Sequence, residues 1–468
     1  MAVSRWTTIT PWPYFDERDA ADAIREALPD VAPFRAWSNF SFVADSGHVH
    51  RIDLLVAAPG GLFVVELDAS RGRVANHGPV WVISSGPTQV ARDSPGRVAA
   101  IKAHALGQAL SRAAAQSGLP MPPVFGVVQL TFPATEIDLD PAEAAAVYRP
   151  DGTGGDGPWL VRDLLARTPA DHRDALPDWL SEAVTGLLAR IGTAPSQLSH
   201  PVGTWRVVEP PLELSPNAQD HIAWSTVLDK ISVRARVFVA RPDAPVAQRT
   251  RLDESVCREY LLLSELDHPD IARPEMIGNH EAGPALLYKH DRRGVRFDHY
   301  LALYGNRLGR AAADDMIGRL GDALAYAHGR GAYHLDLSVR VLTVTPHPDH
   351  FGELDDGWLD PRVRITDWRR AGQVGGEPAR YGIDPVAADM LGLGVVALAA
   401  RTGRPADDGV AGLVTSYLAQ GGPVRLNPSH RIGDLVDRLL STEDASQIRP
   451  AIEAFLRLDP RVGEVLSA

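Results

Sequence analysis

The feature that most restricts the fold of this chain is the glycine-rich stretch Asp151–Pro158, which reads DGTGGDGP. Glycine and proline at this density interrupt helices and strands, and they are typical of breaks between compact units. The chain has 468 residues, which is more than a single hydrophobic core normally serves. We therefore place a first domain at residues 1–150, a glycine-rich break and helical linker at 151–202, and a second domain at 203–468.

The first domain has the residue pattern of an α/β fold. Apolar residues recur at helical spacing in Asp16–Leu28, behind an acidic start, and in the alanine-rich stretch Pro95–Ala115. Strand-like runs of apolar residues occupy Asn39–Ala44, Arg51–Ala57, Gly61–Leu67 and Pro123–Leu130. The order of helix, three strands, helix and strand predicts an α/β domain.

Three segments of this domain resemble the nuclease-related domain, a distant relative of restriction-endonuclease cores. They are AWSNFSFVAD at Ala36–Asp45, IDLLV around Asp53 and VVEL around Glu66, and the resemblance covers about residues 13–135. In such nucleases, an aspartate on one strand and an E-x-K sequence on the next strand converge on a divalent cation. The resemblance therefore implies a restriction-endonuclease-like fold with Asp53 and Glu66 as metal ligands.

The chain departs from this nuclease pattern at the lysine position, where it has Asp68. A third carboxylate adds negative charge where a phosphate must approach, and we expect no neighbouring residue to replace the lost cation. The alternative is that Lys102, on the following helix, reaches back as a migrated lysine. We therefore predict a degenerate nuclease domain, and we keep a metal-dependent nuclease as an alternative.

Four segments of the C-terminal half together resemble parts of Ser/Thr protein kinases. They are Leu252–His268 (LDESVCREYLLLSELDH), Ala323–Leu337 (ALAYAHGRGAYHLDL), Ile365–Arg369 (ITDWR) and Asp389–Gly394 (DMLGLG). In that order they match the C helix, the helix that leads into the catalytic loop, the metal-binding segment, and the helix that anchors the catalytic loop. The resemblance implies an α+β bilobal protein-kinase-like domain.

The same resemblance assigns roles to four acidic residues of this half. Asp336 would be the catalytic residue, Asp367 would bind a metal with the nucleotide, and Glu259 would assist nucleotide binding from the C helix. ATP and Mg²⁺ would be the cofactors. We expect Asp389 to be buried and to accept hydrogen bonds from the backbone of the catalytic loop, while Asp336 should be partly exposed.

The residues that hold nucleotide phosphates depart from the kinase pattern. No glycine occurs within residues 204–277, so the stretch Leu228–Val239, which we match to the glycine-rich loop, has none. We match the nucleotide-binding lysine to Gln248 or Arg249, and neither supplies a compact ammonium group. The second metal ligand, normally an asparagine, is Val341. These departures predict a pseudokinase, with an atypical Ser/Thr kinase as the alternative.

Two further stretches bear on the kinase-like half, and the first supports the prediction of a pseudokinase. The activation segment, Asp367–Pro385, contains no serine or threonine, so phosphorylation of such a residue cannot order it. Ser446–Leu458 has the pattern of a last helix.

The combination of both halves resembles the kinase component of phage-growth-limitation and BREX-type bacterial defence systems. LDLSVRVLTV at Leu335–Val344 resembles their atypical catalytic loop, and ITDWR resembles their tryptophan-containing metal-binding segment. The resemblance implies a DNA methyltransferase and an ATPase of the same system as protein partners. It also leaves nucleic acid as a partner of the N-terminal domain.

Composition narrows the functional classes. The formal net charge is −12, which disfavours a protein that nucleic acid wraps over a large surface. A single cysteine, Cys257, excludes an internal disulfide, and no run approaches the about 20 apolar residues of a membrane span. We expect a cytoplasmic protein without membrane contact, which acts as a scaffold or regulator in phage defence.

Overall fold

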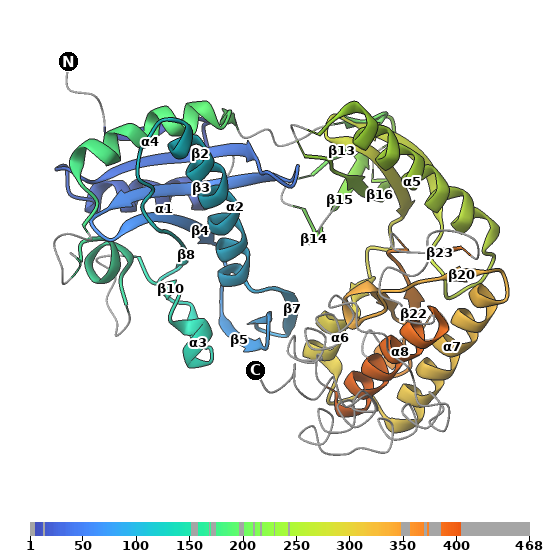
Figure 1. Cartoon of the computed structure of the whole chain (residues 1–468). Helices are drawn as coiled ribbons and strands as arrows, with labels where there is room; N and C mark the ends of the chain where they lie inside the picture. The colour runs from blue at the N-terminus through green and yellow to red at the C-terminus, as the bar shows by residue number, and fades with distance from the viewer. Residues whose placement is uncertain are drawn as a thin grey trace, which may run out of the picture. The chain divides into compact units, whose positions relative to one another are not determined.

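The computed structural model in Figure 1 describes residues 5–12, 15–150, 158–167, 169, 175–195, 201–208, 211–215, 218–228, 230–241, 244–347, 356–368, 372–373 and 385–403. Most of the glycine-rich break, most of the activation segment and the whole of Ser446–Leu458 lie outside these residues. The chain forms two compact units, Met1–Asp253 with Gly278–Ala285, and Glu254–Ile277 with Leu286–Ala468. The domain boundaries near 150 and 203 stay predictions.

A mixed sheet forms the centre of the nuclease-like part of the first unit, with the strand order β1-β2-β3-β4-β8-β10. Its strands are β1 (Trp6–Thr8), β2 (Arg35–Val43), β3 (Val49–Ala58), β4 (Gly61–Asp68), β8 (Val124–Leu130) and β10 (Val147–Tyr148), with β11 (Ala194–Pro195) beside β2. Strands β2, β3 and β4 are antiparallel, whereas β4 and β8 are parallel. The four strands predicted from the sequence are confirmed.

Helices cover both faces of this sheet (Figure 1). Helices α2 (Pro95–Gln116) and α4 (Asp178–Arg190) pack on one face, and α1 (Phe15–Ala27) packs on the other with the π-helix η1 (Leu160–Leu165). Helix α2 begins where Ser94 accepts a hydrogen bond of 3.1 Å from the Arg97 N–H and Pro95 occupies the first turn. Both helices predicted for this domain are confirmed.

A small antiparallel sheet lies between β4 and α2 in sequence, and the sequence did not predict it. It contains β5 (Arg73–His77), β6 (Val80–Ser85) and β7 (Thr88–Asp93), and β9 (Glu136–Asp138) adds a parallel edge. The buried indole of Trp81 joins Val74 to Val128 and Leu130 of the central sheet in one apolar cluster. A short helix, α3 (Pro141–Ala144), follows β9.

The kinase-like half begins with a second sheet whose strand order is β12-β13-β15-β16-β18-β17, with β14 beside β15. The strands are β12 (Pro201–Val202), β13 (Trp205–Val207), β14 (Glu213–Ser215), β15 (Ala218–Ser225), β16 (Ser232–Phe238), β17 (Pro274–His280) and β18 (Gly283–Lys289). Strand β16 directly precedes helix α5 (Val246–Glu265) in the chain. This order decides which residue occupies the position of the kinase lysine.

The second unit is mainly helical. Its main elements are α5 from Glu254 onward, α6 (Phe297–Tyr304), α7 (Arg310–His328) and α8 (Pro385–Thr402), with the short strands β19 (Val295–Arg296), β20 (Ala332–Tyr333), β21 (Leu342–Thr345), β22 (Arg362–Ile365) and β23 (Gly372–Gln373). Two short 3₁₀ turns, Val339–Val341 and Asp356–Trp358, flank β21. Apolar residues of α5 to α8 and of β21 and β22 share one core. Among the described residues, no helix combines the length and apolarity needed to cross a membrane.

Candidate functional site

The carboxylate of Glu66, near the end of β4, receives a lysine from helix α2. The Lys102 ammonium donates to both carboxylate oxygens of Glu66, at 2.8 and 2.6 Å, and the residue is only 6% exposed. The contact forms because α2 packs across the face of the sheet on which Glu66 lies, the face that also carries Leu62 and Val64. The expectation that no residue replaces the lost cation was wrong, and the alternative based on Lys102 describes the observed contact.

Asp53 lies on β3, beside Glu66, and is held by two groups. Its Oδ2 accepts a hydrogen bond of 3.1 Å from the Leu67 N–H, and its Oδ1 lies 3.4 Å from the Arg51 guanidinium. Arg51 also pairs with Glu17 of α1 at 2.8 Å. The site therefore combines three carboxylates with two cations, and all five side chains are largely buried.

Burial changes the proton affinity of this cluster. It raises the pKa of Glu66 to about 7, because desolvation and the neighbouring charge of Asp53 together outweigh the attraction of Lys102. Burial also raises the pKa of Glu17, although Arg51 opposes the shift. Glu66 consequently exchanges its proton near neutral pH, where a metal ion can compete for the same oxygens.

The donor set suits a hard divalent cation such as Mg²⁺, which prefers oxygen ligands and keeps several waters. Asp53 and Glu66 would supply the carboxylate oxygens. Within the described ranges, no third acidic or imidazole ligand converges with these two closely enough to complete an all-protein site. Such a cation would therefore keep coordination positions for water and a phosphate oxygen, as catalytic sites require.

Asp68, at the position of the nuclease lysine, is turned into a separate network. Its Oδ1 accepts a hydrogen bond of 3.0 Å from the Ser70 N–H, and its Oδ2 pairs with Arg92 of β7. Arg92 also donates to the Ser70 hydroxyl at 2.7 Å. The negative charge of Asp68 is thus neutralised by Arg92 of the small sheet that follows β4. The sequence did not predict this sheet.

The position of the kinase lysine belongs to Arg236. In kinases this lysine lies on the third strand, immediately before the C helix. Here that strand is β16, and Val233–Arg236 (VRAR) takes the place of the V-A-I-K sequence. The assignment to Gln248 or Arg249 was wrong, because both residues lie inside helix α5. The assignment of Leu228–Val239 to the glycine-rich loop was also wrong, because most of this segment forms strand β16.

The guanidinium of Arg236 is engaged within the sheet. Its Nε and one terminal nitrogen each lie 2.7 Å from an oxygen of Asp220, the residue opposite it on β15. Arg234 pairs with the same carboxylate. The ion pair is buried, because Asp220 is 3% exposed and Arg236 is 2% exposed. Burial alone would raise the pKa of Asp220, but the two arginines hold it far below its usual range.

In the second unit, Asp389 organises the catalytic-loop segment as predicted. The fully buried carboxylate accepts hydrogen bonds from the N–H groups of His334 at 2.9 Å and Leu335 at 2.6 Å, and it also contacts the His328 ring at 2.8 Å. These bonds hold Leu335 in a left-handed conformation, with φ of 65°, which a non-glycine residue adopts only under constraint. The prediction of a buried anchor is confirmed.

His334 links the two segments that carry Asp336 and Asp367. The Asp336 N–H donates to its Nδ1 at 3.2 Å, so the ring proton lies on Nε2, which donates to the Thr366 carbonyl at 2.9 Å. Asp336 is half-buried, as expected, whereas Asp367 is 5% exposed with φ of 62°. The structure therefore brings the two aspartates onto neighbouring segments.

The other predicted kinase residues are Val341 and Glu259. Val341, at the second metal position, is a buried apolar side chain. Glu259 is also buried, and its Oε1 lies 3.5 Å from the Tyr288 hydroxyl, which is long for such a hydrogen bond. Trp368, which replaces the phenylalanine of the metal-binding segment, packs edge-on against His334 with ring centres 5.0 Å apart.

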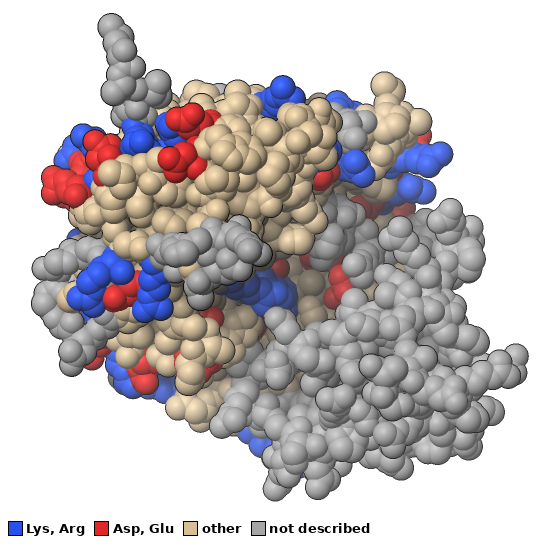
Figure 2. Space-filling view, turned by 60° about the vertical axis from the view of Figure 1, so that its left-hand side comes forward, with Lys and Arg blue, Asp and Glu red and all other residues tan. Residues whose placement is uncertain are grey.

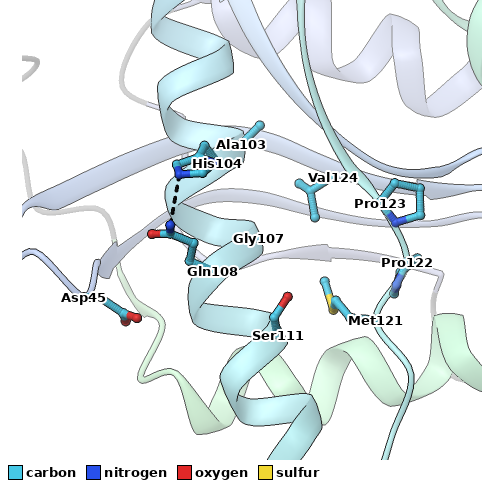
Figure 3. A pocket seen from close by; sticks show the side chains of 10 residues that line it. All are labelled: Asp45, Ala103, His104, Gly107, Gln108, Ser111, Met121, Pro122, Pro123 and Val124. Carbon is cyan, nitrogen blue, oxygen red and sulfur yellow. Dashed lines mark hydrogen bonds between the residues drawn. The ribbon is translucent and has the colours of Figure 1, made fainter. Parts of the chain in front are cut away.

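A pocket of about 850 Å³ lies between α2 and the segment Met121–Val124 (Figure 3). Asp45, His104, Gln108 and Ser111 line it on the polar side, and Met121 lies opposite them. None of the candidate site residues lines this pocket. The chemistry of the buried carboxylates therefore identifies the candidate site better than the pocket does.

These elements define a nuclease-related α/β domain joined to a protein-kinase-like α+β domain, which confirms the predicted fold class. Residues 13–131 match the family model of the nuclease-related domain. The whole chain is 28% identical, over 513 aligned residues, to the "Probable kinase PglW" of Streptomyces coelicolor. The alignment covers 100% of this chain but 32% of that protein, so the chain spans about a third of the length of its curated relative.

Solved kinase domains are similar at a lower level. A crystal structure of a double mutant of the Mycobacterium tuberculosis PknI kinase domain is 19% identical, with a TM-score of 0.35, and the match covers 52% of this chain and 98% of that one. For the PknI kinase domain without those mutations, the identity is 16%, the TM-score 0.33, and the coverage 55% and 98%.

Proposed function

We propose that the N-terminal domain is a metal-dependent nuclease that uses Asp53, Glu66 and Lys102, within a kinase-like protein of bacterial phage defence. The observation that carries the proposal is the contact of the Lys102 ammonium with both oxygens of Glu66. It supplies the cation that the nuclease pattern requires, from a different element of the fold. The defence role rests on the resemblance of the whole chain to PglW, and a methyltransferase and an ATPase remain proposed partners.

The choice of residue at position 102 supports a chemical role. Only three of the 47 basic residues of this chain are lysines, and one of the three is buried against Glu66. For a purely structural ion pair, arginine is the usual choice because its planar fork matches a carboxylate. A compact ammonium suits a site in which a water molecule and a pentavalent phosphate must share the space.

Each residue of this site has a separate role in the proposed hydrolysis of a phosphodiester. A divalent cation bound by Asp53 and Glu66 would neutralise the phosphate and activate water. Lys102 would stabilise the negative charge that develops on the phosphate oxygens. Arg51 holds Asp53 in place, and the Leu67 N–H fixes the orientation of the carboxylate. Lys, Arg, Asp and Glu side chains are interspersed on the face that Figure 2 shows.

The test is nicking of supercoiled plasmid with Mg²⁺ or Mn²⁺. We expect cleavage by the wild-type protein and a loss of at least about 100-fold in Lys102→Met, because removal of one charge-stabilising donor has an effect of that order. Lys102→Arg should lose most of the activity as well. Lys289→Met, which removes an exposed lysine, is the control and should cut normally. A wild-type protein that fails to nick, or a Lys102→Met variant that nicks equally well, would refute the proposal.

A second proposal concerns the kinase-like domain, which we infer to act through its fold rather than by phosphate transfer. The supporting observation is the two-point contact of Arg236 with Asp220, which engages the cation at the lysine position. We expect no change in melting temperature with millimolar Mg–ATP. A shift of several degrees that disappears in Asp367→Ala would instead favour an atypical kinase.

A further inference from the structure

A glutamine of the kinase-like sheet binds the strand that carries the nuclease-type carboxylate. The Gln219 amide nitrogen donates to the Val49 carbonyl at 2.8 Å, and the Val49 N–H donates to the Gln219 Oε1 at 3.3 Å. Both residues lie in the first compact unit, and Gln219 is 2% exposed. The side chain thus pairs with both main-chain groups of one residue, as a neighbouring strand would.

The tip of the β2–β3 hairpin is shaped for this contact. Gly47, in the turn before Val49, has φ of 94°, and a Cβ placed on it would lie 2.0 Å from the carbonyl oxygen of Ala240, just after β16. Only glycine permits this approach of the two backbones. The neighbouring His48 and His50 are buried as well. The hairpin tip and the kinase-like sheet are therefore fitted to each other at two points.

A short stretch of β3 connects this contact to the site. Val49 lies four residues before Asp53 and two before Arg51, which binds Asp53 and Glu17. Arg51 is fixed from the side by Asn39 of β2, whose amide oxygen accepts from its Nε at 3.3 Å. A shift of β3 along its length would move both charged residues together, and catalytic groups lose function when displaced by about 0.5–1 Å.

We propose that Gln219 is a positioning residue for the nuclease-type site, so that the kinase-like sheet sets the register of Arg51 and Asp53. This inference rests on the proposed nuclease function, and it also states a structural coupling that can be measured without cleavage. Gln219 is followed on β15 by Asp220, the partner of Arg236, so one strand carries the contact to the nuclease-like domain and the neutralised lysine position.

The first experiment compares Gln219→Leu with Gln89→Leu in the full chain. Gln89 is an exposed glutamine of β7 whose side-chain amide donates to the Ser84 hydroxyl at 3.1 Å. In Gln219→Leu we expect hydrogen exchange of the β3 amides to accelerate about tenfold, because two hydrogen bonds are lost, while exchange in β6 and β7 stays unchanged. Plasmid nicking should fall at least tenfold in kcat at unchanged KM. Gln89→Leu should match the wild type in all three measurements.

The second experiment tests the hairpin tip and guards against misfolding of the first variant. Gly47→Ala places a methyl group against the Ala240 carbonyl, whereas Gly86→Ala adds a methyl group at another positive φ, of 60°, in open space. We expect only Gly47→Ala to reproduce the exchange and kcat effects. Unchanged β3 exchange in both Gln219→Leu and Gly47→Ala would overturn the coupling. If the wild type does not nick, the nuclease proposal fails, while the exchange data still decide whether Gln219 holds β3.

Discussion

The carboxylate site of the nuclease-like domain and the lysine strand of the kinase-like domain have both lost the expected lysine, with opposite results. In the first, Lys102 reaches Glu66 from a helix, and the net arrangement of acids and cation persists. In the second, an arginine occupies the position but is bound by Asp220 within its own sheet. A missing motif residue is therefore informative only when the partners of the remaining charges are known.

The ion pair of Arg236 with Asp220 should contribute more to the free energy of unfolding than the ion pair of Lys102 with Glu66. Asp220→Ala leaves Arg234 and Arg236 without the buried carboxylate, and breaking such a pair lowers the unfolding free energy by about 3–5 kcal/mol. Asp138→Ala is the control, because its pair with Arg73 is more than half exposed and should contribute under about 1 kcal/mol. Chemical denaturation followed by circular dichroism measures both. Equal effects would mean that Asp220 does not neutralise a buried cation.

The C-lobe anchor should come next in size. Asp389→Ala strands the N–H groups of His334 and Leu335, at about 1–3 kcal/mol for each buried donor. Asp336→Ala removes a half-exposed acid and should change stability by under about 0.5 kcal/mol. Melting temperature and phage protection should both fall in the first variant and stay unchanged in the second. Loss of protection in Asp336→Ala at an unchanged melting temperature would contradict the proposed role of the fold.

Glu66 should make the nuclease-like domain pH-sensitive. Its pKa is about 7 in the folded protein against 4.5 in the unfolded chain, so the folded state binds more protons between these values. The stabilisation that comes from the raised pKa of Glu66 is fully present below pH 4.5, falls as the pH rises, and is lost above about pH 7. We expect a loss of about 2–3 kcal/mol across this window, absent in Glu66→Gln but retained in the exposed control Glu26→Gln. Denaturation midpoints at several pH values provide the measurement.

The smallest effect should follow restoration of the lysine at its usual position. Asp68→Lys would place a cation beside Arg92, which already binds Asp68 and Ser70. We expect the second cation to lower the free energy of unfolding by about 1–2 kcal/mol. Because Lys102 already contacts Glu66, we expect the variant to gain no nicking activity. Nicking that appears only in Asp68→Lys would show that Lys102 does not replace the missing lysine.

Much of this protein was determined by the sequence alone, wherever the signal was local. Helices and strands of the nuclease-like domain follow from apolar periodicity over 7 to 22 residues. The buried role of Asp389 came instead from the resemblance of its segment to the loop-anchoring helix of kinases. The small sheet from Arg73 to Asp93 was not predicted from the sequence, because its short strands are mostly half-exposed and carry few alternating apolar residues.

Tertiary structure alone decided the identities of the charge partners. Lys102 and Glu66 are 36 residues apart, and their contact depends on the rotation of α2 against the sheet, which periodicity does not specify. Arg236 could be placed only from the strand order, because the preceding strands β12, β13 and β14 are two or three residues long and have no readable period. Periodicity reports which face of an element is buried, whereas an ion pair depends on which two faces meet.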